Sequence, residues 1–489
     1  MKSELGITVK KEEDFSEWYS QVIQKSELAD IRFGIQGFIV HQPWGFLIIR
    51  KIYEYLEKEI EEQGHLPFLF PIAVKEESLK KEKEHAGFTP EVFWVSEAGS
   101  KKIEERFALR PTGEAQIYPM YSLWFRSHKE LPFLGYQSRL SVFRNEMTTR
   151  PFLRGREFLF FESHDVFNTH NEALKQIEKD LEICEKVIYK KIKIPFYYFK
   201  RPEWDRFKGA DSTFTPDTLM PDGKRNQLAS THDLGQNFSK AYNIKVLNNE
   251  GKEQFVWQTC FGPGIWRIMA ALIGIHGDDK GLILPFDIAP IQIVIIPIIL
   301  KEKKESKDIV AQCKKLEEQL KRNYRVKFDN TEETPGYKYN KWELKGVPIR
   351  LEIGPKELNG KTVSLALRTE NKKSIVKISD LEKEIKSASL KLDNAIKIKA
   401  DNNFKNNVKN AGSLKELKCL IKKDKGFIKV PFCSVERDGE KCADILKAET
   451  EGGNICGALY PKEEKISSNQ KCIVCSKKAN HIVYIAKSY

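Results

Sequence analysis

Cysteine, long apolar runs and an apolar leader are what this sequence lacks. Only nine of its 489 residues are cysteine, and five of these lie between Cys433 and Cys475, which is not the pattern of a disulfide-stapled secreted protein. The longest apolar stretch, Ile288–Leu300, has 13 residues including two prolines and is too short to span a bilayer. Met1–Asp14 is polar and shows no secretory leader. We therefore expect a cytosolic (cytoplasmic) protein with no membrane partner and a small metal site.

Positive charge is distributed unevenly along the chain. The composition, 40% hydrophobic and 31% charged, excludes a disordered or fibrous protein. The formal net charge is +13, of which residues 1–300 carry about −2 and residues 301–489 about +15. A nearly neutral body with a basic end indicates that only this end holds a polyanion. The alternative is a set of lysine-rich solvated faces without such a partner.

The first 285 residues predict one domain that mixes helices with an antiparallel sheet. Residues 15–63 and 171–192 have the period of helices. Residues 107–167 and 225–260 alternate as strands do. We take residues 1–285 as this domain.

After Pro285 the pattern changes to that of a small α/β domain, predicted over residues 286–390. Its expected elements are strand 291–299, helix 307–323, strands 324–328, 347–353 and 362–367, and a helix from about 378. Residues 391–430, rich in Lys and Asn, are expected to link this domain to a cysteine-bearing tail. Residues 391–489 form the third predicted domain, and the fold class is α+β.

Two glycine motifs resemble nucleotide-binding loops only weakly. Gly354–Thr362 has five residues between its glycines where a phosphate loop has four, and we expect it between two strands rather than before a helix. We therefore reject it as a phosphate loop. Gly262-Pro-Gly264 is better explained as the turn that enters an apolar helix, Ile265–Ile275, in which Arg267 lies.

Arginines and aromatic residues alternate between Val142 and Asp165, in the sequence VFRNEMTTRPFLRGREFLFFESHD. Strand alternation puts Arg144 and Glu146 on one face. It puts the following residues on one face of the next strand: Arg154, Arg156, Phe158, Phe160, Glu162 and His164. Buried unpaired charges are too costly for an ordinary core, and the aromatic residues between them indicate a pocket. Arginines on a rigid sheet suit a polyphosphate, because guanidinium binds two oxygens at once.

These motifs resemble those of a known enzyme family. FRNE with REF, and then GPGIWR, look like motifs 2 and 3 of class II aminoacyl-tRNA synthetases. GHLPFLFPI, a predicted strand at His65–Ile72, resembles motif 1, which lies at the dimer interface. Five further segments are together similar to segments of prolyl-tRNA synthetases of the archaeal/eukaryotic type: RPTGE, RPFLRGREF, THDLGQNF, HGDDKGLILP and WELKGVPIRLEIGPKEL. The short interval from Arg156 to Arg267 leaves little room for the editing domain of bacterial-type relatives.

The resemblance implies that L-proline is attached to tRNA(Pro) in two ATP-dependent steps by a homodimer. The proline carboxylate attacks the α-phosphate of ATP, and the terminal ribose hydroxyl of tRNA then attacks the prolyl-adenylate. No protein nucleophile is needed, so positioning and electrostatics, with Mg²⁺ sharing the phosphate charge, should provide the rate. The alternative is a catalytically dead paralogue that binds tRNA or regulates another enzyme.

The same resemblance implies roles for single residues. For ATP, Arg144 would hold the α-phosphate, Glu146 the adenine amino group, Arg154 phosphate or adenine, and Arg267 the γ-phosphate, with Gln227 and Ser230 at nucleotide-binding positions. For proline, Thr112 and Glu114 would meet the imino group, and the pocket would be completed by Phe158, Phe160, Glu162, His164 and His232. The chain departs from relatives at Phe160, which is often Trp, at Gly155 and Ser230, which are Thr in some, and at GPGIW.

The basic end carries two further candidate sites. Glu343, Arg350 and Lys356 occupy positions that contact anticodon bases in the family, and their donors and acceptors suit splayed bases. A surface ion-pair cluster is the alternative.

Four cysteines of the tail, Cys433, Cys442, Cys472 and Cys475, resemble the family's structural Zn²⁺ site. Cys456 or His481 could replace one ligand, and reduced thiols without metal are the alternative. The resemblance also implies that Tyr489 folds back toward the catalytic domain.

Overall fold

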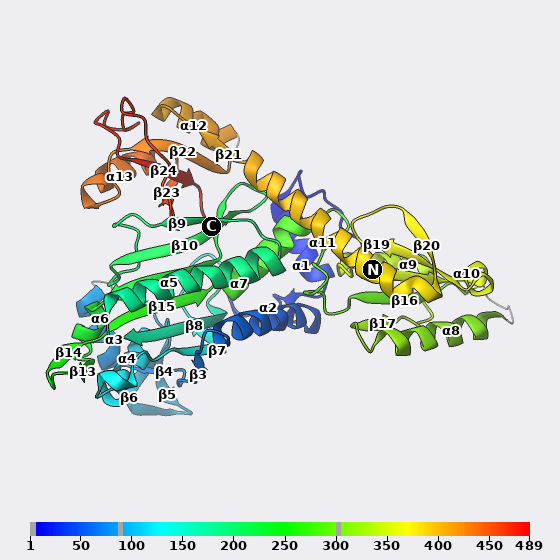
Figure 1. The fold of residues 1–489 in the computed structure, drawn as a ribbon, viewed down its shortest axis with the longest axis horizontal. Coiled ribbons are helices and arrows are strands. Elements are labelled where there is room, and N and C mark those ends of the chain that lie inside the picture. Colours follow the sequence, from blue (N-terminus) through cyan, green and yellow to red (C-terminus); the bar gives the residue numbers. More distant parts are fainter. Residues whose placement is uncertain (1–5, 87–90, 300–304, 424) are drawn as a thin grey trace.

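One long sheet runs through the catalytic and C-terminal parts of the protein (Figure 1). The structure is a computed structural model that describes residues 6–86, 91–299, 305–423 and 425–489. The strand order of this sheet is β21-β22-β24-β23-β9-β10-β12-β15-β8-β7-β3, and β11 pairs with β10. Its strands are β3 (Leu66–Pro67), β7 (Gly135–Phe143), β8 (Glu157–Phe167), β9 (Tyr197–Lys200), β10 (Ser212–Leu219), β11 (Arg225–Gln227), β12 (Ala229–Gly235), β15 (Trp257–Pro263), β21 (Val408–Asn410), β22 (Phe427–Phe432), β23 (Asn454–Leu459) and β24 (His481–Ala486).

Helices and small sheets surround the catalytic half of this sheet. The helices are α1 (Phe15–Lys25), α2 (Pro43–Glu61), α3 (Glu76–Ala86), α4 (Glu114–Trp124), α5 (His170–Cys184), α6 (Asn237–Ala241) and α7 (Ile265–Ala271). The small sheets are formed by β1 (Ala29–Asp30) with β2 (Val40–His41), by β4 (Ala73–Lys75), β5 (Trp94–Ala98) and β6 (Lys101–Leu109), and by β13 (Lys245–Leu247) with β14 (Glu253–Phe255). The main core lies where α1, α2 and α7 pack against the sheet, so α7 is held rigidly at the wall of the site described below.

The α/β part has its own five-stranded sheet, in the order β17-β16-β18-β19-β20. Its strands are β16 (Ile293–Pro297), β17 (Val326–Phe328), β18 (Ile349–Ile353), β19 (Thr362–Leu367) and β20 (Lys373–Lys377), and its helices are α8 (Glu305–Leu320), α9 (Pro335–Leu344), α10 (Pro355–Gly360) and α11 (Leu381–Asn406). β16 is parallel to β17 and β18, whereas β19 and β20 are antiparallel. This mixed sheet matches the predicted small α/β unit.

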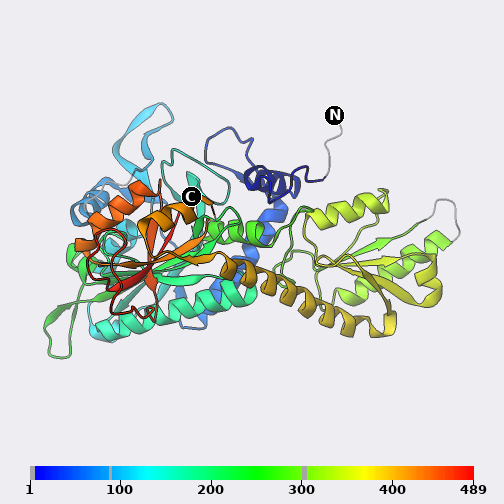
Figure 2. The same cartoon turned by 90° about the horizontal axis from the view of Figure 1, so that it is seen from above.

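The C-terminal part extends the catalytic sheet. Leu459 of β23 pairs with Phe199 of β9 in antiparallel register, so the two parts share one ladder of strands. Helices α12 (Leu414–Lys423) and α13 (Glu440–Glu449) pack on this end of the sheet. Figure 2 shows α11 running from the α/β sheet toward the C-terminal part. β23 therefore lies beside β9 of the same sheet.

Several predicted loops proved to be helices. The stretch expected to link the tail, from residue 391, begins inside α11, whose buried residues Leu392, Ile396 and Ala400 recur every four positions. Residues 329–346 hold α9, in which Pro335 takes the first helical position after Thr334, the N-cap. The start of α9 is encoded in the sequence, but a helix as short as α9 lacks the long periodicity that makes prediction secure.

Three more local predictions need correction. Gly354–Thr362 contains α10, which starts at Pro355, although it also lies between β18 and β19 as expected. The predicted strand at His65–Ile72 is reduced to the two residues of β3. The antiparallel stretch 107–167 is interrupted by α4, whose buried face includes Glu114.

The α+β fold class is confirmed, with a sheet-based catalytic core followed by an α/β unit and a cysteine-bearing end. Within the described residues, no helix is both long enough and apolar enough to cross a membrane.

Candidate functional sites

A cavity of about 370 Å³ opens on one face of the catalytic sheet. On β12, Ser230 and His232 line the cavity, whereas Thr231 between them donates to Asp180 Oδ2 of α5 at 2.7 Å. Strand alternation thus separates two faces: α5 packs against one, and the cavity lies on the other.

All of the residues predicted to bind ATP or proline line this cavity, except His164. They come from α4 and the turn before it (Thr112, Glu114), from the connection between β7 and β8 (Arg144, Glu146, Arg154), from β8 (Phe158, Phe160, Glu162), from β11 and β12 (Gln227, Ser230, His232) and from α7 (Arg267). His164 lies deeper on β8 and is fully buried behind the cavity wall.

The expected strand alternation is wrong for the arginines that precede β8. β7 ends at Phe143 and β8 begins at Glu157, so Arg144 and Arg154 lie on the connecting loop. Arg150 and Arg154 exchange backbone hydrogen bonds across a small turn there. Arg156 does not line the cavity, because its Nε donates to the backbone oxygen of Glu146 at 3.0 Å.

Two buried carboxylates, Glu114 and Glu162, give one end of the cavity a negative charge. Thr112 donates to Glu114, while Glu162 accepts from Gln137 Nε2 at 2.6 Å and lies 3.1 Å from His164 Nε2. Burial opposes protonation of His164, but Glu162 outweighs this effect and raises the pKa of the imidazole. Two carboxylates facing one imidazole suit a small cationic group.

His232 adds no charge to this pocket. Burial, reinforced by His164 and Arg201, lowers the pKa of His232 to about 3. Its Nδ1 lies 2.9 Å from Thr213 Oγ1 and its Nε2 3.1 Å from Ser230 Oγ. A neutral imidazole held on both nitrogens shapes the pocket and leaves its charge to the carboxylates.

Two arginines without partners among the described residues, Arg144 and Arg267, also line the cavity. In the described part of the chain, neither Arg144 nor Arg267 has a hydrogen bond or ion pair to its guanidinium, and Arg144 lies 5.9 Å over the ring of Phe158. Burial, followed by repulsion from Arg154 and Arg225, lowers the pKa of Arg267 to about 10, so this arginine stays cationic at neutral pH. Cationic guanidinium groups without partners favour a polyanion.

Tyr489 reaches this loop, as the resemblance implied. Arg154 Nη2 donates to the Tyr489 backbone oxygen at 2.9 Å, while Arg154 Nη1 lies 3.2 Å from Glu146 Oε2. The Tyr489 hydroxyl donates to Asp222 Oδ1 at 2.6 Å, and Arg150 lies over the ring. Arg154 is therefore held in place before any ligand binds.

Sequence reasoning missed three important cavity residues: Arg201, Arg225 and Trp266. Trp266 explains two departures from the family together. A Cβ added at Gly155 would lie 2.5 Å from the Trp266 ring, so the indole of GPGIW fills the space that a larger residue would need. The Trp266 ring lies 6.4 Å from that of Phe158 and adds to the aromatic wall. The departures at Gly155 and at GPGIW occur together in this sequence, and this was the feature that could have revealed the contact between Gly155 and Trp266.

A second cavity, of about 80 Å³, lies in the α/β part and is lined by Glu343 of α9 and Arg350 of β18. Arg350 Nη1 donates to Glu343 Oε1 at 3.1 Å, and Nε donates to Glu352 Oε1 at 2.9 Å. The Arg350 guanidinium lies 4.1 Å over the ring of Tyr339. Lys356, on α10, is exposed and does not line this cavity, so the structure brings together two of the three predicted residues.

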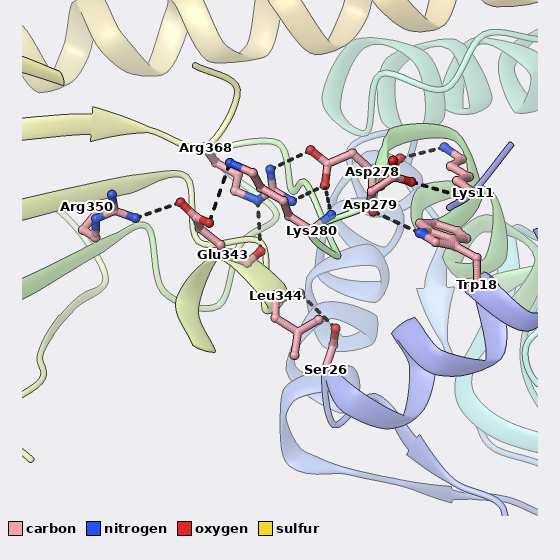
Figure 3. Close-up of polar contacts among 11 residues, drawn as sticks. Lys11, Trp18, Ser26, Asp278, Asp279, Lys280, Glu343, Leu344, Arg350 and Arg368 are labelled. Carbon is pink, nitrogen blue, oxygen red and sulfur yellow. Dashed lines mark hydrogen bonds and ion pairs between the residues drawn. The ribbon is translucent and has the colours of Figure 1, made fainter. Parts of the chain in front are cut away.

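The HGDDKG segment, residues 276–281, contributes Lys280 to this second cavity. Figure 3 shows the polar contacts between this segment and the α/β part. Lys280 Nζ lies 3.9 Å from Glu343 Oε2. Arg368 binds both carboxylate oxygens of Asp278, at 2.9 and 2.5 Å, and its Nε donates to the Glu343 backbone oxygen. Trp18 donates to the Asp278 backbone oxygen at 3.0 Å. The segment is thus fixed between α1 and the α/β sheet.

Four cysteine sulfurs meet in the C-terminal part, and all lie within 4.8 Å of one another: Cys433, Cys442, Cys472 and Cys475. Tetrahedral zinc with Zn–S bonds of about 2.3 Å separates its sulfurs by roughly 3.8 Å, so the cluster fits this ion. Cys456 lies apart in β23, and His481 Nδ1 is 3.0 Å from Glu463 Oε2. Neither alternative ligand belongs to the cluster.

Three family models match successive parts of the chain. The tRNA synthetase class II core domain (G, H, P, S and T) matches residues 93–276, the anticodon binding domain matches residues 292–388, and the prolyl-tRNA synthetase C-terminal domain matches residues 414–489. The order of the three matches follows the order of the three parts of the structure.

Relatives match over the whole length. The chain is 50% identical to the proline–tRNA ligase of Thermofilum pendens over 100% of both sequences, and 39% identical to that of Pyrococcus horikoshii over 98% of each. Among solved structures it is similar to Giardia lamblia prolyl-tRNA synthetase in complex with prolyl-adenylate, with a TM-score of 0.94, 32% identity and coverage of 99% and 100% of the two chains. The Cryptosporidium parvum enzyme, complexed with halofuginone and AMPPNP, gives a TM-score of 0.93 at 33% identity, covering 100% and 98%.

Proposed function

The chain belongs to the prolyl-tRNA synthetases of the archaeal and eukaryotic type, and from this membership we propose which residues carry out each step of the reaction. It is a proline–tRNA ligase that acts through prolyl-adenylate. One observation carries the residue assignments: a single cavity joins a pair of buried carboxylates to a set of unpaired arginines. The cationic imino group of an amino acid and a polyphosphate therefore fit side by side.

Proline binds at the carboxylate end. Glu114 and Glu162 attract its NH₂⁺ group, and Thr112 keeps the Glu114 carboxylate in place. Phe158 and Phe160, whose rings stand 6.2 Å apart and nearly perpendicular, pack on the apolar ring of the substrate. His164 and His232 complete the pocket from behind and from the side.

ATP binds along the arginines. Arg144 holds the α-phosphate and Arg267 the γ-phosphate end, each with a guanidinium that has no competing partner among the described residues. Glu146 accepts from the adenine amino group, and Arg154 contacts phosphate or adenine. Gln227 and Ser230 complete the nucleotide site on neighbouring strands.

The chemistry needs no protein nucleophile. A proline carboxylate oxygen attacks the α-phosphorus and pyrophosphate leaves, after which the terminal ribose hydroxyl of tRNA(Pro) attacks the prolyl carbonyl and AMP leaves. Arg144 neutralises the charge that develops on the α-phosphate. The rigid strands hold both reactants at attack distance.

The phosphates of ATP would bring Mg²⁺ to the cavity. Carboxylates line the cavity, but among the described residues no three of them lie close enough together to share one ion, so the protein offers no cage of its own for Mg²⁺. Mg²⁺ commonly keeps several waters and binds through substrate phosphates. We expect it to share the phosphate charge with the arginines.

Zn²⁺ stabilises the C-terminal part. Cys433, Cys442, Cys472 and Cys475 supply four thiolates, which matches a closed structural site. Metal analysis of the purified enzyme should give about one zinc per chain. A value well below one would refute this assignment.

The tRNA anticodon binds at the second cavity. Glu343 accepts from a base amino group, and Arg350 donates to guanine acceptors at the same cavity. Lys356 lies exposed on α10, where it can reach an RNA strand that passes outside the cavity. The domains are residues 1–285 for aminoacylation, 286–390 for the anticodon and 391–489 for zinc.

The enzyme works as a homodimer in the cytoplasm, where it supplies prolyl-tRNA for translation. Support for the dimer comes from the segment that resembles motif 1, in which Leu66 and Leu69 are 65% and 78% exposed. Light scattering of the wild type should give twice the chain mass, and Leu69→Glu should yield monomers. A monomeric wild type would refute the dimer.

Proline-dependent exchange of pyrophosphate into ATP tests the residue assignments with a panel of amino acids. We expect exchange with proline and much less with cysteine, alanine, threonine or glycine. A Glu162→Gln protein should lose proline binding while its affinity for ATP is kept. Equal proline KM values in this variant and the wild type would remove Glu162 from the proline pocket.

A further inference from the structure

Asp217 is a fully buried carboxylate on β10 that faces two guanidinium groups at the catalytic cavity. Its Oδ2 lies 2.9 Å from Arg201 Nη2 and 3.5 Å from Arg225 Nη1, and both arginines line the cavity. One buried carboxylate balances one buried cation. The two arginines together therefore keep a positive charge beside the cavity.

Arg201 has the closer contact with the Asp217 carboxylate. Its Nη2 donates to Asp217 Oδ1 at 3.1 Å and to Gln227 Oε1 at 3.0 Å, and its Nη1 donates to the Cys456 backbone oxygen at 2.7 Å. Arg225 has the longer ion pair and a contact with the Cys456 thiol, while its Nη1 is enclosed and has no hydrogen-bond partner in the described part of the chain. Arg225 is therefore the less fully hydrogen-bonded cation of this cluster.

Other groups near Arg225 do not neutralise it. Burial raises the pKa of the Cys456 thiol to about 11, so the thiol carries no charge at neutral pH. Asp205, another carboxylate that interacts with Arg225, is exposed at the rim of the cavity, where water screens its charge.

The backbone aims Arg225 into the cavity. Arg225 and Gln227 lie two residues apart on β11 and so share its cavity face, whereas Asn226 between them donates to the Arg267 backbone oxygen at 2.9 Å. The Arg225 amide donates to the Lys487 backbone oxygen at 2.7 Å. Its side chain, 12% exposed, thus lines the same cavity as Arg267.

We propose that Arg225 is a further catalytic residue, which contacts the β- and γ-phosphate end of ATP and the departing pyrophosphate, and that Asp217 positions it. The inference rests on the ATP-binding roles proposed for Arg144 and Arg267. When a proline carboxylate oxygen bonds to the α-phosphorus, the bond from that phosphorus to the bridging oxygen breaks and its electron pair leaves on pyrophosphate. Arg225 stabilises this leaving charge through a charge-assisted hydrogen bond.

Pyrophosphate exchange with the full-length enzyme tests the inference. Arg225→Gln should raise the KM for ATP and the KM for pyrophosphate about tenfold each, since one lost charge-assisted hydrogen bond corresponds to roughly this change. The KM for proline should not change. Arg225→Lys should recover part of the loss, and Asp217→Asn should raise the same two constants by less. Arg106→Gln, which removes an exposed arginine paired with Glu76, is the matched control and should behave as wild type.

Two results would overturn the inference. If Arg225→Gln keeps both constants within about twofold of wild type while Arg267→Ala abolishes exchange, then Arg225 only joins strands, and the proposed ATP site stands. If Arg225→Gln lowers the Tm and raises the KM for proline in parallel, its effect is structural. Should Arg144→Ala and Arg267→Ala both leave exchange intact, the proposed ATP site itself fails, which is a separate outcome.

Discussion

The catalytic cavity and the smaller cavity of the α/β part both contain arginines, but they differ in whether the arginines are paired with carboxylates. Arg267 has no ion pair among the described residues, and burial, followed by repulsion from neighbouring arginines, lowers its pKa. Arg350 is hydrogen-bonded to Glu343, and Arg368 binds both oxygens of Asp278. One cavity therefore holds free positive charge, and the other holds charge that is already compensated.

This difference corresponds to two kinds of ligand. Free guanidinium groups repel one another in the empty cavity, and a polyphosphate removes that repulsion and gains their hydrogen bonds. Paired groups such as Glu343 and Arg350 are satisfied without ligand, so a base must exchange one hydrogen bond for another. Such an exchange adds little affinity. It discriminates against bases that cannot replace the hydrogen bond between Glu343 and Arg350 that they displace.

Removing one free arginine should have the largest effect. Arg144→Ala should reduce proline-dependent pyrophosphate exchange by about 10²–10³-fold, the size seen when one donor to a developing anion is lost. Arg350→Ala, which changes an arginine of the compensated cavity, is the matched control and should exchange at the wild-type rate. Exchange by Arg144→Ala equal to wild type would favour a binding paralogue over a ligase site at this cavity.

The sequence predicted most of the residues named above that line the catalytic cavity, because they lie in contiguous motifs. Phe158, Phe160 and Glu162 alternate along β8 as expected. Arg201 and Arg225 could not be found in this way, since each lies in an ordinary polar stretch and only strand pairing brings them to Asp217. Pairing between distant strands is the part of a fold that local sequence encodes least.

The same limit applies to the second cavity. Its predicted residues Glu343 and Arg350 come from one motif, but Lys280 and Arg368 come from segments on either side of it in the sequence. Their contact depends on how the HGDDKG segment packs against the α/β sheet. The resemblance indicated which residues we expect to meet the ligand, and it did not indicate which neighbours hold those residues in place.

Glu343→Gln should have the second largest effect, and only on the tRNA step. The substitution keeps the shape of the side chain and removes the charge that Arg350 and a base amino group share. We expect kcat/KM for tRNA to fall about 10–100-fold, as for the loss of a specific base contact, with exchange unchanged. Glu449→Gln, at an exposed pair with Lys418, is the control. A parallel loss of exchange would show that this cavity acts on the first step too.

Asp278→Asn should reduce stability by a smaller amount. The change leaves Arg368, 2% exposed, without its anionic partner, which corresponds to about 1–3 kcal/mol or a fall in Tm of about 2–4 °C. Burial opposes ionisation of Asp278, but Arg368 outweighs it and lowers the carboxyl pKa. The stabilisation is therefore present above the unfolded pKa of about 3.9 and is lost as the pH falls further. The difference in Tm between variant and wild type should close below about pH 4. A difference in Tm that persists below this pH would mean that the shape of the Asp278 side chain, and not its charge, stabilises the protein.

Lys280→Ala should have the smallest effect, although Lys280 lines the same cavity as Glu343. Its Nζ lies 3.9 Å from the Glu343 carboxylate and its side chain is 55% exposed, and such pairs contribute about 0–1 kcal/mol. We therefore expect kcat/KM for tRNA to stay within about threefold of wild type, with less loss in high salt. A loss as large as that of Glu343→Gln would mean that the ammonium contacts RNA directly. The second cavity would then hold one free cation among its compensated ones, and the contrast with the catalytic cavity would be a matter of degree.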